Sequence, residues 1–153
     1  MSTEERKTIY LCLARMSEEG YEQKYVKEAF DTNWVVPMGP NVNAFEQNLA
    51  DFANANSDGS KLARKVVCLS AGTAAVHLAL IACGVKAGDE VCVQSFTFCA
   101  SSHPITYLGA KPVFIDSERE TWNMDPELLE KAIIERKAAI GKYPKAIIPV
   151  ALY

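Results

Sequence analysis

Hydrophobic residues form short continuous runs in the second part of the chain and recur at helical spacing in the first part. Continuous apolar runs predict strands buried on both faces, as in a parallel sheet. Segments with helical character lie between these runs. The predicted strands are 66–69, 90–93, 112–115 and 146–150. Three helices are predicted: one over 73–83, one in a small-residue run that ends at Leu108–Gly109, and one that starts at Asp125 and ends at Gly141. This alternation indicates an α/β fold in three layers with a mostly parallel sheet.

The first 60 residues predict helices, apart from a possible short extended piece at 9–13. Ser17 is a candidate N-cap of an amphipathic helix that ends near Thr32, and Asn41 is a candidate N-cap of a second helix. The segment 34–40 between them contains two prolines and a glycine, so it predicts an extended loop. We therefore divide the chain into a helical segment, 1–60, and the first part of a large α/β domain, 61–153.

The junction at residues 66–80 is the most informative stretch. A predicted strand passes through small residues, Ser70 to Thr73, into an apolar helix. Such a break leaves the first N–H groups of the helix unpaired at the positive end of its dipole, which favours a phosphate. The same pattern is equally typical of a tight turn that lets a helix lie close to its sheet.

Composition limits the possible partners. Hydrophobic residues make up 49% and charged residues 23% of the chain, as in globular proteins. The net charge of −3 gives no electrostatic case for nucleic acid or for an anionic membrane. The apolar runs are too short to span a membrane and the N-terminus has no signal-peptide core, so we expect a cytoplasmic protein.

Cysteine and histidine give no pattern of a metal site. The five cysteines include no CxxC pair, and neither of the two histidines has a partner at metal-ligand spacing. We expect reduced thiols that serve as small core residues, and no bound metal. His77 and His103 are interpreted as packing or interface residues.

Several longer segments together resemble one family. They read NWVVPMGPNVNAFEQNLADF (33–52), LSAGTAAVHLAL (69–80), GVKAGDEVCVQSFTFCASSHPITYLGAKPVFIDSERETWNMDPELLEKAI (84–133) and IPVALY (148–153). In this order and spacing the chain resembles the N-terminal part of the DegT/DnrJ/EryC1/StrS sugar aminotransferases. These are pyridoxal-phosphate enzymes of the aspartate-aminotransferase fold. The resemblance is strongest to the branch that aminates nucleotide-linked 4-keto-6-deoxy sugars.

The resemblance implies particular roles for seven residues. Gly72, Thr73 and Ala74 would hold the phosphate of pyridoxal 5'-phosphate, and Phe98 would stack on its pyridine ring. Trp34, Met38 and Gly39 would lie near the entrance for the substrate. The implied partners are a nucleotide sugar, an amino donor (glutamate) and a second copy of the chain in a homodimer.

The resemblance also implies that essential groups lie elsewhere. The family's aldimine lysine and the carboxylate that pairs with the pyridine nitrogen come after the position of Tyr153, and no lysine present here matches. Asp116 and Asp125 do not match that carboxylate, and Arg15 stands where relatives often carry histidine. We therefore expect an inactive N-terminal fragment with no catalytic residue. In the family the first strand pairs with a late strand, so 66–69 is expected to lack its usual neighbour.

Two other functions remain open from the residues. The first is a Rossmann-like nucleotide-binding module, although the turn reads SAGTAA and not GxGxxG. The second is a non-catalytic product that associates through an exposed sheet edge. From local pattern alone Phe98 would be a core residue, and Asp116 could cap the loop that follows it.

Overall fold

The computed structural model describes residues 15–55 and 64–152, which belong to two compact units. Unit 1 ends at Cys68 and unit 2 begins at Leu69, whereas the sequence predicts a boundary at residue 60. The expected polar turn at 54–60 lies mostly outside the described residues. No helix in the described ranges is long and apolar enough to cross a membrane.

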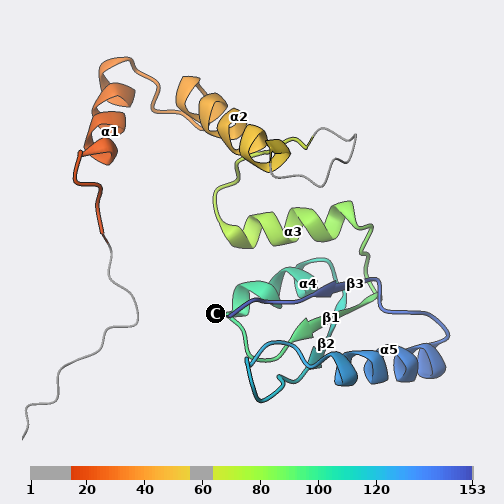
Figure 1. Cartoon of the computed structure of the whole chain (residues 1–153). Coiled ribbons are helices and arrows are strands. Elements are labelled where there is room, and N and C mark those ends of the chain that lie inside the picture. Colours follow the sequence, from red (N-terminus) through yellow and green to blue (C-terminus); the bar gives the residue numbers. More distant parts are fainter. Residues whose placement is uncertain (1–14, 56–63, 153) are drawn as a thin grey trace, which may run out of the picture. The chain divides into compact units, whose positions relative to one another are not determined.

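Unit 1 contains helices α1 (Tyr21–Asp31) and α2 (Pro40–Ala55) (Figure 1). Gly20 occupies the N-cap position of α1, so the prediction of a Ser17 cap is wrong, although the Ser17 hydroxyl oxygen accepts from the Tyr21 N–H at 2.8 Å. The Ser17 N–H and hydroxyl in turn donate to the Glu22 carboxylate at 2.9 and 2.6 Å. These bonds, the hydroxyl first, lower the pKa of Glu22. Ser17 thus binds both the Tyr21 N–H and the Glu22 carboxylate at the start of α1.

Helix α2 starts two residues earlier than predicted. Pro40 is its first residue, so Asn41 lies inside the first turn and the prediction of an Asn41 cap is wrong. Proline suits this position because its ring presets the helical φ angle and the missing N–H would have had no partner in the helix. The loop predicted at 34–40 is confirmed up to Gly39, although it has bends at 36–39 and is not extended throughout.

The segment 64–68 is not a strand, so the strand predicted at 66–69 is wrong. The Asn54 side chain exchanges two hydrogen bonds with the Arg64 backbone, at 2.8 and 3.2 Å. The Cys68 N–H donates to the Glu46 carboxylate at 2.7 Å. Side chains of α2 therefore take the backbone groups that a neighbouring strand would pair in a sheet.

Unit 2 is built on a parallel sheet of three strands, in the order β2-β1-β3. The strands are β1 (Glu90–Gln94), β2 (Lys111–Ile115) and β3 (Ala146–Ile148). The predicted α/β fold with a parallel sheet is confirmed, with three of the four expected strands. Val91 on the central strand lies opposite Pro112 on one side and Ala146 on the other.

Helices cover both faces of this sheet. They are α3 (Gly72–Ala82), the 3-10 helix η1 (Cys99–Ser101), α4 (His103–Tyr107) and α5 (Pro126–Ile140). Helices α4 and α5 lie on opposite faces, and α3 packs on α4 and η1 (Figure 1). This follows from the strand order, because right-handed connections that run in opposite directions across a sheet place their helices on opposite faces.

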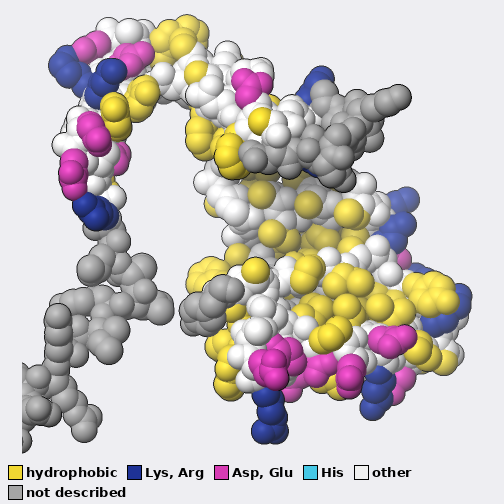
Figure 2. Space-filling view, in the orientation of Figure 1, with side chains coloured by type: hydrophobic (Ala, Val, Ile, Leu, Met, Phe, Trp, Pro, Cys, Tyr) yellow, Lys and Arg dark blue, Asp and Glu magenta, His cyan; other side chains and the backbone are white. Residues whose placement is uncertain are grey.

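The core of unit 2 surrounds the central strand. Every residue of β1 is buried, and Ile105 of α4 is fully buried against it. Other core residues are Leu80, Val85, Val91, Val93 and Ala110. Many large apolar side chains stay outside this core, and hydrophobic groups gather on the visible surface of unit 2 (Figure 2). The four described cysteines are free, but only Cys92 is buried, so the core role expected of Cys83 and Cys99 is wrong.

Helix α5 begins and ends as the sequence predicts. The Asp125 carboxylate accepts from the N–H groups of Glu127 and Leu128 at 2.8 and 3.1 Å. Pro126 follows at the first helical position, and Gly141 ends the helix with a φ of 76°, which favours glycine.

An ion pair with a buried carboxylate and a half-buried guanidinium ties α5 to the central strand. Arg136 donates to both carboxylate oxygens of Glu90, at 2.7 and 2.8 Å. The Glu90 side chain is 7% exposed. Its hydrogen bonds and its charge raise the pKa of Arg136.

Replacing Arg136 by methionine should leave the buried Glu90 carboxylate without its partner. We expect Arg136→Met to lower the free energy of unfolding clearly more than the loss of an exposed ion pair does, measured by urea denaturation followed by circular dichroism. The control is Lys131→Met on the same helix, whose exposed contact with Glu135 spans 3.9 Å. That control should cost about 0.3 kcal/mol. Equal losses in the two variants would contradict the role given to the Glu90 pair.

Candidate functional site

The start of helix α3 offers unpaired N–H groups. The first bond along the helix runs from the Ala75 N–H to the Ala71 oxygen at 3.1 Å, so the N–H groups of Gly72, Thr73 and Ala74 precede it. Ala71 at the cap position is extended and, within the described part of the chain, no side chain caps the helix. A Cβ added to Gly72 would meet nothing within 4 Å. The helix start is therefore open to an anion.

Phe98 lies in the loop that follows the central strand and is 79% exposed. It is not a core residue, contrary to the interpretation from local pattern alone. With Phe96, Thr97 and Leu152 it lines a cavity of about 280 Å³ at the carboxyl ends of β1 and β3. The next element, η1, packs on α3. Phe98 is the residue that directly precedes η1 in unit 2.

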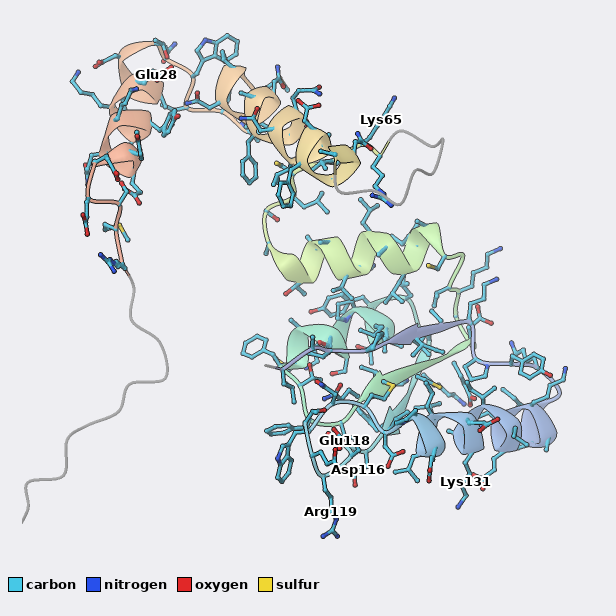
Figure 3. The ribbon with its side chains drawn as sticks, viewed as in Figure 1. Glu28, Lys65, Asp116, Glu118, Arg119 and Lys131 are labelled. Atoms are coloured by element: carbon cyan, nitrogen blue, oxygen red, sulfur yellow. The ribbon has the colours of Figure 1, made fainter. Side chains whose placement is uncertain are left out.

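Trp34, Met38 and Gly39 come together in unit 1. All three line one cavity of about 140 Å³, which Glu28 of α1 also lines (labelled in Figure 3). Gly39 has a φ of 138°, and a Cβ there would lie 3.0 Å from Cε3 of the Trp34 ring. The indole of Trp34 therefore needs glycine at this position. No contact between these residues and a substrate follows from this geometry.

A larger cavity opens between the carboxyl ends of β1 and β2. Its volume is about 620 Å³, and its lining is Ser95, Phe96, Asp116, Ser117, Glu118, Arg119 and Trp122. Asp116 and Glu118 lie close together, whereas Arg119 points away from the ribbon (Figure 3). The Asp116 carboxylate accepts from the Ser117 N–H at 2.8 Å and the Ser95 hydroxyl at 3.3 Å. Asp116 thus supports the loop after it, which is the structural alternative left open by the sequence.

Glu118 shapes the same loop. Its carboxylate accepts from the N–H groups of Glu120 and Thr121 at 2.5 and 2.7 Å, and from the Thr121 hydroxyl. These bonds, that of the Thr121 hydroxyl first, lower the pKa of Glu118 below its usual value of 4.5. The loop carries Trp122 in a left-handed conformation with a φ of 63°, and its ring lies 5.9 Å from that of Phe96.

Sequence reasoning missed Gln94. This residue ends β1, is fully buried, and bonds to the loops after all three strands. The sequence does contain a signal for it, because Gln94 is an amide that directly follows the apolar residues of the predicted strand 90–93. A buried amide needs partners for its oxygen and its nitrogen, so it indicates a hydrogen-bonding centre. In the described ranges, no group of three His, Cys, Asp or Glu residues could hold a metal ion.

Solved structures with this architecture are aminotransferases of the pyridoxal-phosphate fold type I. A DegT DnrJ EryC1 StrS aminotransferase from Brucella abortus superposes with a TM-score of 0.69 at 28% identity, over 92% of this chain and 37% of its own. NtdA from Bacillus subtilis, with bound PMP, superposes with a TM-score of 0.70 at 26% identity, over 90% of this chain and 28% of its own.

Residues 16–153 match the DegT/DnrJ/EryC1/StrS aminotransferase family, and the chain belongs to it. EpsN of Bacillus subtilis strain 168, a protein named provisionally as a pyridoxal phosphate-dependent aminotransferase, is 52% identical over 96% of this chain and 35% of its own length. GDP-perosamine synthase of Caulobacter vibrioides is 38% identical over 88% of this chain and 32% of its own. The chain thus spans about a third of the length of these relatives.

The residues present fit part of a pyridoxal-phosphate site. A phosphate needs several N–H donors and a positive dipole end, which the uncapped start of α3 offers. A pyridine ring needs an aromatic or apolar surface, which the exposed ring of Phe98 offers. The structure thus has a suitable group for each end of the cofactor, both within unit 2.

Removing the Glu118 acceptor should loosen the loop that carries Trp122. Because the folded pKa of Glu118 lies below its usual value, its stabilising bonds are present at neutral pH and are lost as pH falls through that lowered pKa. In a Trp34→Phe background, where Trp122 is the remaining tryptophan, we expect its fluorescence to shift toward the red on acidification from pH 6 to 3. Glu118→Gln should show that shift already at pH 7.

The control for this experiment is Glu120→Gln in the same background. Glu120 is exposed in the same loop, and its backbone N–H is bound by Glu118. It should keep the emission and the acid transition of the parent. A Glu118→Gln variant with the parent's emission at pH 7 and the parent's acid transition would show that Glu118 does not hold the loop.

Proposed function

We propose that this chain supplies part of the pyridoxal 5'-phosphate site of a nucleotide-sugar aminotransferase. It provides the groups that bind the phosphate and the aromatic ring that stacks on the pyridine ring. The observation that carries the proposal is the open start of α3, with three N–H groups ahead of the first helical bond, in a chain of this family. The exposed ring of Phe98 on the adjoining element adds to it.

Each residue has a defined task in this proposal. The N–H groups of Gly72, Thr73 and Ala74 and the Thr73 hydroxyl donate to the phosphate, and the dipole of α3 offsets its charge. Phe98 covers one face of the pyridine ring and keeps water from it. When bound, the cofactor supplies an electron sink for carbanion chemistry. Trp34, Met38 and Gly39 stay candidates for the entrance to the substrate site.

The substrate in this proposal is a nucleotide-linked keto sugar, specifically a 4-keto-6-deoxy sugar that takes its amino group from glutamate. Two relatives carry names that support the class. One is the GDP-perosamine synthase described above, and the other is UDP-2-acetamido-2-deoxy-3-oxo-D-glucuronate aminotransferase of Pseudomonas aeruginosa, 42% identical over 76% of this chain. The proposal also includes cytoplasmic location, assembly with a second copy, and a role in surface-polysaccharide or glycan biosynthesis.

Binding without catalysis is the expected behaviour of the 153 residues alone. No lysine of the chain matches the family's cofactor-linking lysine, and neither Asp116 nor Asp125 matches its carboxylate. Both aspartates already have structural tasks, since Asp116 supports its loop and Asp125 caps α5. We expect no transaminase activity and no absorbance band of a covalent adduct after dialysis with pyridoxal 5'-phosphate.

Pyridoxamine 5'-phosphate is the appropriate probe, because it needs no lysine. We expect the chain to bind it in isothermal titration calorimetry, and Thr73→Val and Phe98→Ala to weaken the affinity about tenfold each. The reasons are the lost hydroxyl donor and the lost ring surface. Matched controls are Thr106→Val on α4 and Phe114→Ala on β2, both at exposed residues.

The outcome separates the proposal from its alternatives. Equal affinity in Thr73→Val, Phe98→Ala and the controls would contradict the assigned site. Tight binding of NAD in place of pyridoxamine 5'-phosphate would favour the nucleotide-binding module. No binding, together with self-association that charged substitutions on β3 abolish, would favour the non-catalytic product that pairs through its sheet edge.

A further inference from the structure

Gln94 joins the segments that follow the three strands of the sheet. Its side-chain nitrogen donates to the carbonyl oxygens of Phe96 and Trp122, at 3.1 and 3.0 Å. Its side-chain oxygen accepts from the Val150 N–H at 3.3 Å. The residue is 0% exposed, so these bonds form away from water and each unmet group would be costly.

The three partners lie on three different loops. Phe96 follows β1, Trp122 lies in the loop after β2, and Val150 follows β3. A second bond reinforces the link, since the Leu152 N–H donates to the Asn123 side-chain oxygen at 3.1 Å. The segments after all three strands are thereby joined to one another through the side chains of Gln94 and Asn123.

The left-handed backbone of Trp122 is explained by the same contact. A φ of 63° is unfavourable for a bulky residue and persists where surrounding bonds impose it. The Trp122 carbonyl receives the Gln94 amide proton in this conformation. Gln94 therefore helps to hold a conformation that the loop would not adopt without such bonds.

The cavity beside Phe98 depends on this arrangement. Phe96, Thr97 and Phe98 line it from the segment after β1, and Leu152 lines it from the segment after β3. Gln94 bonds to the backbone of both segments, at Phe96 and at Val150. The Gln94 amide thus helps to set the spacing of the two walls, together with the bond from Leu152 to Asn123.

We propose that Gln94 is a positioning residue. It holds the loop of Phe98 against the segment that follows β3, so that the ring can stack on the cofactor. It touches neither cofactor nor substrate. The inference rests on the proposed function for the identity of the ligand. The requirement is specific to an amide, because only an amide offers two donors and an acceptor at this size. A carboxylate of the same shape would face two carbonyl oxygens, and a thioether would leave all three partners unmet.

The test compares Gln94→Met and Gln94→Glu in the full chain with Trp34→Phe, where Trp122 reports alone. Both variants should lose the parent's Trp122 emission and near-ultraviolet circular dichroism at pH 8, and bind pyridoxamine 5'-phosphate about tenfold more weakly. Protonation gives the carboxyl introduced by Gln94→Glu a donor, and burial favours the neutral form. The Gln94→Glu variant should therefore regain part of the parent's spectrum at pH 5.5, while Gln94→Met should not.

The readouts separate failure of this inference from failure of the proposed function. The matched control is Gln23→Met, at an exposed position of α1, which should match the parent throughout. Parent-like Trp122 spectra in both Gln94 variants, or no recovery of the Gln94→Glu spectrum on acidification, would overturn the inference. If the spectra change and recover as expected but the parent does not bind pyridoxamine 5'-phosphate, Gln94 still positions the loops and the cofactor proposal fails. If the spectra change but the variants bind pyridoxamine 5'-phosphate as tightly as the parent, the proposed link between Gln94 and the cofactor is overturned.

Discussion

The pairing of β1 on both of its edges is the constraint on which unit 2 depends. Parallel neighbours occupy both sides of this strand, and helices cover both faces of the sheet. Its side chains are all buried, so its carboxyl end has little freedom to move. The loop that carries Phe98 begins at that end, and the segments after β2 and β3 bond to it. The position of these loops is therefore set by the end of β1.

The candidate cofactor site combines a backbone feature with a side-chain feature. The start of α3 offers donors because an extended Ala71 precedes the helix and its methyl group cannot cap it. The Phe98 ring is exposed in the segment after β1, and the Phe96 carbonyl oxygen of that segment accepts from the Gln94 amide. Neither feature supplies reactive chemistry. The two together are suited to hold a flat, phosphate-bearing molecule, in agreement with the family to which the chain belongs.

The sequence predicted best where a local rule decides the structure. Asp125 before Pro126 set the start of α5, and the apolar run at 90–93 predicted the central strand. It failed at 66–69, where an apolar run without a neighbouring strand is held by polar side chains of α2 instead. The hydrogen bonds of Gln94 join residues 28 and 56 positions away along the chain, and no local pattern contains that information.

The most direct test is to map pyridoxamine 5'-phosphate on the chain by nuclear magnetic resonance, using backbone amide shifts of ¹⁵N-labelled protein. We expect the largest shifts on Gly72, Thr73 and Ala74, with smaller ring-current shifts around Phe98, and we expect inorganic phosphate to reproduce only the first set. Shifts confined to other parts of the chain, or absent at millimolar ligand, would contradict the proposed site.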